Sequence, residues 1–131
     1  MNREILFRGK RVDNGEWVDG DLIHGVGNKE GKIFILPIVK NLASIPGCHP
    51  LDGCEVIPET VGQFTGLKDK NGNRIFEGDM DKDRGVVIWN NDSSQFVIHY
   101  EGIGLEDLTG SEEWFITGTN IHDNPELIKG E

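Results

Sequence analysis

The sequence contains few cysteines, little positive charge and no long apolar run. None of its apolar runs approaches the roughly 20 residues that span a bilayer. The opening MNREILFRGK lacks the apolar region and the small-residue cleavage site of a signal peptide. Two cysteines, Cys48 and Cys54, are too few for a disulfide framework. We therefore expect a cytoplasmic protein with reduced thiols and no membrane contact.

Basic residues are outnumbered by acidic ones, 13 to 23, which gives a net charge of −10. Nucleic-acid binding depends on Lys and Arg side chains that displace counterions from phosphates, so direct binding of DNA or RNA is disfavoured. The basic pairs Lys10 with Arg11 and Lys68 with Lys70 are small. The charge favours instead a partner with a basic surface.

Short runs rich in Ile, Val, Phe and Trp are separated by turn residues every ten residues or so, which is typical of a small β-barrel or β-sandwich. Pro37 lacks an amide proton and should interrupt the most hydrophobic of these runs. Residues 102–113 are polar, with at most one helical turn at 105–108. The predicted strands are residues 4–8, 20–23, 32–39, 55–57, 85–89, 95–100 and 114–116.

The C-terminal residues favour a short helix. Asn124 is a good N-cap, and Pro125 is tolerated at the first helical position. We expect one or two turns that pack through Leu127 and Ile128.

Residues 7–22, FRGKRVDNGEWVDGDL, are echoed by residues 64–80, FTGLKDKNGNRIFEGDM. Asn-Gly predicts a two-residue type I′ turn in both copies, and Gly-Asp a bend before the next strand. The echo predicts related halves, 1–57 and 58–131, that share one core within a single domain, 1–131. Chance recurrence of common turn dipeptides is the alternative. The matched positions are Phe7 with Phe64, Gly9 with Gly66, Asn14-Gly15 with Asn71-Gly72, and Gly20-Asp21 with Gly78-Asp79.

Several of these segments resemble a known family. ETVGQF, TGLKDKNG, the following EGD and the NPEL near the C-terminus are similar to the YopX family of phage and prophage proteins. The opening REILFRGK is also similar, although the family commonly has Ala-Trp at Gly9-Lys10. The ending GTNIHDNPELI differs from the family pattern by an extra Thr119 and by His122-Asp123 in place of Tyr-Glu. Residues 25–53 have no match.

The resemblance implies an SH3-like small β-barrel and a phage or prophage origin. It brings no activity, cofactor or catalytic residue. The shared positions are turn and core positions, so they form a structural motif rather than an active site.

The pattern D-x-D-x-D-x-G at Asp79, Asp81 and Asp83 is similar to the start of a calcium loop, in which alternate carboxylates bind a hard cation. An EF-hand needs Gly where Arg84 stands and a bidentate acid where Asn90 stands. A solvated acidic rim beside a turn is the simpler interpretation, and we predict no metal ion or other cofactor.

The remaining candidates are also weak. Cys48, Cys54 and the scattered histidines lack the paired spacing of a zinc site. A disulfide between the two cysteines, or a nucleophilic cysteine, is less favoured than two reduced thiols. Six aromatic residues could line a binding groove, but short strands need large side chains in their core. They are Trp17, Phe64, Phe76, Trp89, Tyr100 and Trp114.

Three functional hypotheses follow. The first is a non-enzymatic phage accessory protein that binds a host or phage protein, with self-association through strand edges. The second is an acidic mimic of nucleic acid that blocks a DNA-binding protein. The third, and the least favoured, is a metal-dependent hydrolase that uses Asp79, Asp81 and Asp83. A binding site is expected in residues 25–53 or on the acidic face beyond Asp79.

Overall fold

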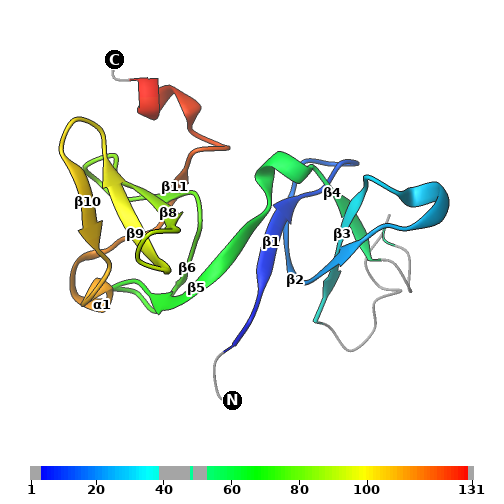
Figure 1. The fold of residues 1–131 in the computed structure, drawn as a ribbon, viewed down its shortest axis with the longest axis horizontal. Helices are drawn as coiled ribbons and strands as arrows, with labels where there is room; N and C mark the ends of the chain where they lie inside the picture. Colours follow the sequence, from blue (N-terminus) through cyan, green and yellow to red (C-terminus); the bar gives the residue numbers. More distant parts are fainter. Residues whose placement is uncertain (1–3, 39–47, 49–52, 130–131) are drawn as a thin grey trace. The chain divides into compact units, whose positions relative to one another are not determined.

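The computed structural model of the chain describes residues 4–38, 48 and 53–129 (Figure 1). The chain is mainly β, with antiparallel strands in two sheets, which confirms the expected class. In the described ranges each helix has three to five residues. None of these helices is long and apolar enough to cross a membrane. The chain divides into two compact units, residues 1–63 and 64–131.

The first unit is an antiparallel sheet in the order β4-β3-β2-β1-β5, of which Gly62 and Gln63 of β5 pair with β1. Most of its strands come from the predicted runs, and β3 ends at Pro37 as expected. The elements are β1 (Phe7–Lys10), β2 (Trp17–His24), η1 (Gly27–Lys29), β3 (Ile33–Pro37), β4 (Cys54–Val56), η3 (Pro58–Thr60) and β5 (Gly62–Lys68).

The sheet of the first unit curls until its first and fourth strands meet. Arg11, directly after β1, forms a bridge with Val56 at the end of β4. The amide of Ile57 donates to the carbonyl of Lys10 at 2.8 Å, and the amide of Val12 donates to the carbonyl of Glu55 at 3.0 Å. The outer edge of β4 is thereby paired, which removes the exposed edge of an open sheet.

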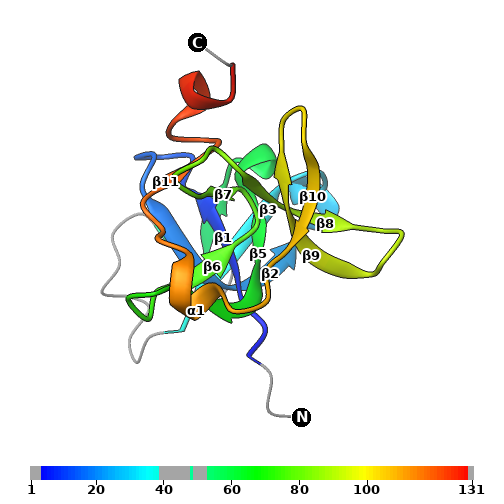
Figure 2. The ribbon, with the colours of Figure 1, turned by 90° about the vertical axis from the view of Figure 1, so that its left-hand side faces the viewer.

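The second unit holds the β5–β6 hairpin and a sheet in the order β10-β9-β8-β7-β11 (Figure 2). Its order matches that of the first unit, with the last strand beside the first and a short helix before the last strand. The elements are β6 (Arg74–Phe76), β7 (Asp79–Met80), β8 (Val86–Asn90), β9 (Gln95–Tyr100), β10 (Gly104–Asp107), α1 (Ser111–Trp114), β11 (Thr119–Asn120) and η4 (Pro125–Lys129).

The sequence echo and the matching strand orders do not coincide. The echo aligns the β1–β2 hairpin with the β5–β6 hairpin, because each carries Asn-Gly in its loop. The strand order instead makes β7 the counterpart of β1. Common turn chemistry therefore relates the two hairpins, whereas the duplicated topology begins at different strands.

The predicted type I′ turns are wrong. That turn needs positive φ at both central residues, but among the described residues outside glycine only Arg84 and Ser94 have positive φ. In the second hairpin, Asp69 and Asn73 enclose a three-residue loop, with Gly72 at φ 82°. Such a loop combines a type I turn with a left-handed glycine. The first hairpin has a four-residue loop, closed by the amide of Arg11 on the carbonyl of Glu16 at 2.9 Å.

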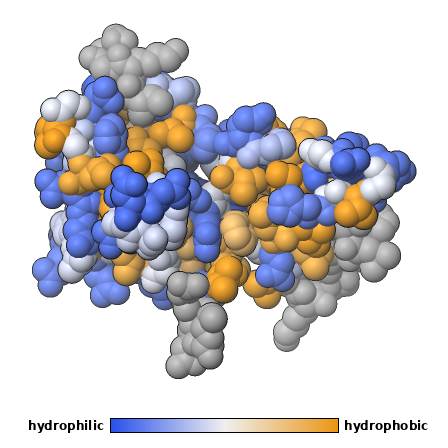
Figure 3. Space-filling model, in the orientation of Figure 1, coloured by the Kyte–Doolittle hydropathy of each residue, from blue (hydrophilic) through white to orange (hydrophobic). Residues whose placement is uncertain are grey.

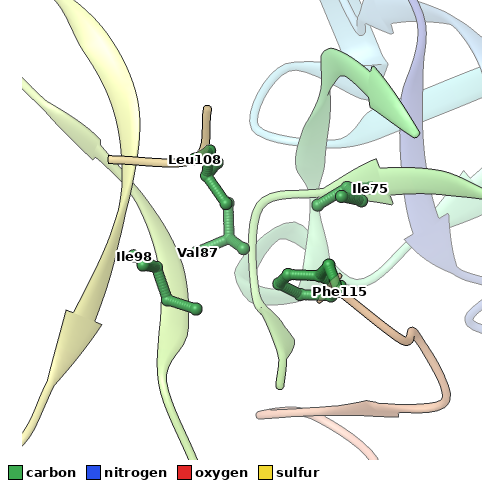
Figure 4. Packing of buried hydrophobic residues seen from close by; sticks show 5 residues of the cluster. All are labelled: Ile75, Val87, Ile98, Leu108 and Phe115. Carbon is green, nitrogen blue, oxygen red and sulfur yellow. The ribbon is translucent and has the colours of Figure 1, made fainter. Parts of the chain in front are cut away.

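A cluster of five fully buried side chains forms the core of the second unit (Figure 4). They come from β6, β8, β9, the segment after β10 and the residue after α1, and they point toward one another in the close view. The sheet and the segment from β10 to α1 thus pack into one body. The members are Ile75, Val87, Ile98, Leu108 and Phe115.

The C-terminal third corrects three expectations. Strand β10 occupies the segment expected to be polar loop or helical turn. The predicted strand at 114–116 is wrong, because Trp114 ends α1 and Phe115 enters the core as a single extended residue. Asn124 is no side-chain cap, because its Oδ1 accepts from the amide of Asn120. The expected short terminal helix is present as η4, a 3₁₀-helix.

Cys48 and Cys54 form a disulfide, so the expectation of two reduced thiols is wrong. Their Cα atoms are 4.5 Å apart, within the range that a disulfide spans. Cys54 is buried at the start of β4. The low number of cysteines indicated only a reducing compartment. It did not show that a separation of six residues lets these two side chains meet.

Reduction of the Cys48–Cys54 bond is expected to lower the free energy of unfolding of the first unit by about 2 kcal/mol, because a short cross-linked loop then regains its entropy in the unfolded chain. Urea denaturation with and without reductant, followed by circular dichroism, measures this loss. The variant Cys48→Ala is the control, since reductant should leave its stability unchanged. Equal stability of the oxidised and reduced protein would contradict the prediction.

Candidate functional site

Asp79 begins β7, whereas Asp81 and Asp83 lie in the turn between β7 and β8, and both Asp79 and Asp81 are buried. Asp79 Oδ2 accepts from the amide of Phe76 at 2.8 Å. Asp81 Oδ1 accepts from the amides of Asp83 and Gly85, at 3.0 and 2.7 Å. Asp83 is exposed. Asp79 therefore stabilises the turn between β6 and β7, and Asp81 the turn between β7 and β8.

Tyr100 on β9 joins the same turn by donating its hydroxyl proton to Asp81 Oδ2. Burial raises the pKa of the Tyr100 hydroxyl, and the hydrogen bond and negative charge of Asp81 raise it further. Tyr100 therefore remains a protonated donor at neutral pH. The ring of Tyr100 is partly exposed beside the turn.

Within the ranges 4–38, 48 and 53–129, no three side chains of His, Cys, Asp or Glu are grouped as metal ligands. Cys48 and Cys54 are bonded to each other, so neither offers a thiolate. His49 lies outside the described residues. The weak zinc and calcium hypotheses thus gain no ligand set from the described part of the chain.

Asp69 is a buried carboxylate that the motif search missed, and it organises the β5–β6 loop. It accepts from the amides of Asn71 and Asn73, at 2.9 and 2.8 Å. The amide and hydroxyl of Thr117 reach its other oxygen, at 2.9 and 2.8 Å. An aspartate two residues before Asn-Gly is a typical Asx-turn signal, which could have identified this residue.

The charge state of Asp69 follows from these bonds. Burial raises the pKa of the Asp69 carboxyl, but hydrogen bonds from the amides of Thr117 and Asn73, from the Thr117 hydroxyl and from the Asn71 amide outweigh burial and lower the pKa to about 2. The carboxylate is thus ionised at neutral pH. Its hydrogen bonds come from the β5–β6 loop and from Thr117, so it ties the chain after α1 to the hairpin.

The residues of the predicted structural motif lie in strands and turns. At Gly20 a side chain would clash with the carbonyl of Leu36 on β3, so close strand approach requires glycine there. Gly15 and Gly72 have positive φ in the hairpin loops, and Asp79 binds Phe76. The others are placed as follows: Phe7 and Gly9 on β1, Asn14 in the first loop, Asp21 on β2, Phe64 and Gly66 on β5, Asn71 in the second loop, Gly78 before β7, and Asn124 and Pro125 at η4.

Of the six aromatic residues, two are buried and two are exposed, whereas Trp17 and Tyr100 are partly buried. Phe64 and Phe76 are buried and their ring centroids are 5.6 Å apart, as expected for core residues. Trp89 and Trp114 are exposed instead. The fully buried aromatic residue of the second unit's core is Phe115, which was expected only as part of a strand.

A groove with a volume of about 920 Å³ lies in the second unit and is the best candidate for a binding site. Its apolar surface comes from β8, the β9–β10 turn, the residue after β11 and η4. Its charged residues come from the turn before β8, the β9–β10 turn and β10. The lining residues are Asp83, Arg84, Val86, Ile88, His99, Tyr100, Glu101, Ile103, Glu106, Ile121 and Leu127.

The groove combines an apolar surface with an acidic margin. Asp83, Glu101 and Glu106 are exposed and are accompanied by a single basic lining residue, Arg84. Ile103 is 78% exposed, which is unusual for so large an apolar side chain. Figure 3 shows apolar residues reaching the surface between hydrophilic ones on the face in view. Concave apolar surface with a few polar groups is typical of binding sites.

Two lining residues were among the sequence candidates: Asp83, considered as a metal ligand, and Tyr100, one of the six aromatic residues considered for a binding groove. The groove lies beyond Asp79, one of the two places where a site was expected. Of the other place, residues 25–53, the structure describes residues 25–38, 48 and 53. Spacing in the sequence gave no signal for the groove, because its residues come from four separate stretches, 83–88, 99–106, 121 and 127.

The family model described as YopX protein matches residues 6–129 of the chain. No curated protein matches the chain.

Proposed function

This chain belongs to the YopX family, and we propose that it is a phage or prophage accessory protein that acts by binding another protein rather than by catalysis. Membership of the family by itself names no activity. The proposal therefore rests on the groove of the second unit and on the charge of the chain. The proposed location is the cytoplasm of the bacterial host.

Each unit is proposed to be an SH3-like small barrel. The shared order, with the last strand beside the first and a short helix before the last strand, supports this architecture. In the first unit the bridge between Arg11 and Val56 brings the first and fourth strands together. Small barrels present loops and strand ends on a fixed frame, which suits recognition of other proteins.

The observation that carries the proposal is the apolar groove with its acidic margin. Val86 and Ile88 offer apolar surface on β8, and Ile103 projects from the β9–β10 turn. An apolar side chain of a partner would lose contact with water there, which is the main source of binding free energy. The groove residues are drawn from the second unit alone.

The charge of the margin specifies the kind of partner. Asp83, Glu101 and Glu106 around the groove, in a chain of net charge −10, favour a protein with a basic patch. Asp69 and Asp81, in contrast, are held by main-chain amides inside the unit. They are not free to imitate phosphates or to bind a metal, so neither alternative hypothesis receives specific support.

The substitution Ile103→Asp is expected to reduce capture of the partner at least about tenfold, because it places a charge on the apolar surface and side chains at interface centres carry most binding energy. The measurement is affinity capture from a host lysate with quantitative mass spectrometry, followed by calorimetry with the purified protein that is recovered.

Val26→Asp is the matched control, because Val26 is also 78% exposed but belongs to the first unit. It should capture the same protein as the wild type. A protein captured equally by wild type and Ile103→Asp would show that the groove is not the binding site. If every captured protein is also held by an unrelated acidic bait, the proposed function is wrong.

A further inference from the structure

Strand β10 ends the sheet of the second unit. The order β10-β9-β8-β7-β11 gives it β9 as its neighbour on one side. In the described part of the chain no strand or isolated bridge pairs with its other side. An edge strand presents N–H and C=O groups in the spacing that an added strand requires.

The corresponding strand of the first unit is different. There the edge of β4 is occupied, because Val12 and Ile57 form main-chain hydrogen bonds with Glu55 and Lys10 next to the Arg11–Val56 bridge. The two units share one strand order, but the outer edge of β4 is paired, whereas no strand in the described part of the chain pairs with the outer edge of β10.

The β10 edge is acidic. Residues 101–107, EGIGLED, contain Glu101, Glu106 and Asp107 and neither Lys nor Arg. All three acidic residues are exposed. Like charges on directly opposed residues destabilise a strand pair, whereas opposite charges stabilise it. This edge therefore disfavours a second copy of itself and favours a basic segment.

The edge also leads to the groove. Glu106 lies in the middle of β10 and lines the groove, as do Glu101 and Ile103 of the preceding turn. Residues paired across neighbouring strands have side chains on the same face of a sheet. A partner residue paired with Glu106 would therefore have its side chain on the groove face of the sheet. The residues before and after it in the added strand would have their side chains on the opposite face, with Leu105 and Asp107.

We propose that β10 is the docking edge for an extended, lysine- or arginine-containing segment of the partner protein, which adds to the sheet as a further strand. Main-chain hydrogen bonds hold the segment, its basic side chains meet Glu101 and Glu106, and an apolar side chain enters the groove. This inference rests on the proposed function, since it specifies the chemistry of the partner at the same site.

The probe is a synthetic peptide, Thr-Lys-Thr-Val-Thr-Lys-Thr with blocked ends, titrated into the full-length ¹⁵N-labelled protein. Its two lysines and its valine lie on one face of the added strand, the face of Glu106 and the groove. Strand addition is expected to shift the amide signals of Gly104–Asp107 and to slow their hydrogen exchange. A peptide with alternate N-methylated amides keeps the charges but lacks half of the main-chain donors, so it should bind at least about tenfold more weakly.

Charge reversal tests the acidic margin. The double variant Glu101→Lys/Glu106→Lys should bind the peptide at least about tenfold more weakly than the wild type. Glu30→Lys/Glu59→Lys is the control, because it makes the same change in net charge at exposed residues of the first unit. Amide spectra of each variant establish that the fold is retained, since all four side chains are exposed.

Three results would overturn the inference: equal binding of the N-methylated peptide, equal losses in both double variants, or absence of peptide binding to the wild type. If any of these occurs while Ile103→Asp still abolishes capture of the partner, strand addition fails but the proposed function stands. If Ile103→Asp captures the partner normally, the groove is not the binding site, and if no protein is captured specifically, the proposed function fails. Sedimentation showing a dimer that Glu106→Lys dissociates would also contradict the choice of occupant.

Discussion

The variant Asp69→Ala is expected to lower the free energy of unfolding of the second unit by about 4 kcal/mol, because a buried carboxylate with five hydrogen bonds is lost and its donors are left without it. Without the Asp69 side chain, Thr117 is no longer hydrogen-bonded to the β5–β6 loop. Urea denaturation followed by tryptophan fluorescence measures it, since Trp89 and Trp114 belong to this unit.

The pH dependence provides an independent check. The folded-state pKa of Asp69 is about 2, below the ordinary 3.8, so its stabilising effect is present above pH 3.8 and is lost as the pH falls toward 2. Over this pH range the free energy of unfolding of the wild type should fall by about 2 kcal/mol, and that of Asp69→Ala should not show this fall. Asp92→Ala, at an exposed turn residue, is the control and should change stability little. A small effect of Asp69→Ala would show that the Thr117 contact is dispensable.

The variant Phe115→Ala should destabilise the second unit by about 4 kcal/mol, because truncation of a fully buried ring removes its hydrophobic contribution and leaves a cavity. The cavity would open among Ile75, Val87, Ile98 and Leu108, which come from different elements (Figure 4). Chemical denaturation of the purified variant is the measurement.

Ile116→Ala is the adjacent control, since that side chain is 51% exposed and should contribute less than about 0.5 kcal/mol. Phe115→Leu should lie between the two variants, because it retains part of the buried volume. Similar losses at positions 115 and 116 would mean that Phe115 does not organise this core.

The strands that could be predicted from sequence are those whose residues carry a strong local preference. Residues 95–100 became β9 without change, and Pro37 ended β3 because it lacks an amide proton. Segment 104–107 was missed because Gly, Glu and Asp are poor strand formers. Its pairing with β9 across a short turn overrides that preference.

Other features depend on partners distant in sequence. Asn14 and Asn71 indicated the hairpins correctly but not the turn type, because loop length is set by the strand pairing on both sides. The sequence predicted Phe115 as the centre of a strand. In the structure its main-chain amide donates to Ser111 and its carbonyl accepts from Lys70, so it is not part of a strand pair. The groove joins β8, the β9–β10 turn and η4, so no local pattern contained it.

The two hairpin loops also affect how the protein ages chemically. At an Asn-Gly step the glycine nitrogen can attack the asparagine side chain, which expels ammonia and forms a cyclic imide. Here the amide of Gly15 is bound to the carbonyl of Arg11 at 2.9 Å, and that of Gly72 to the carbonyl of Asp69 at 3.0 Å. Each nitrogen is thus held away from the attack while its hairpin is closed. Deamidation at Asn14 or Asn71 would then record, as a lasting covalent mark, how often that hairpin has opened.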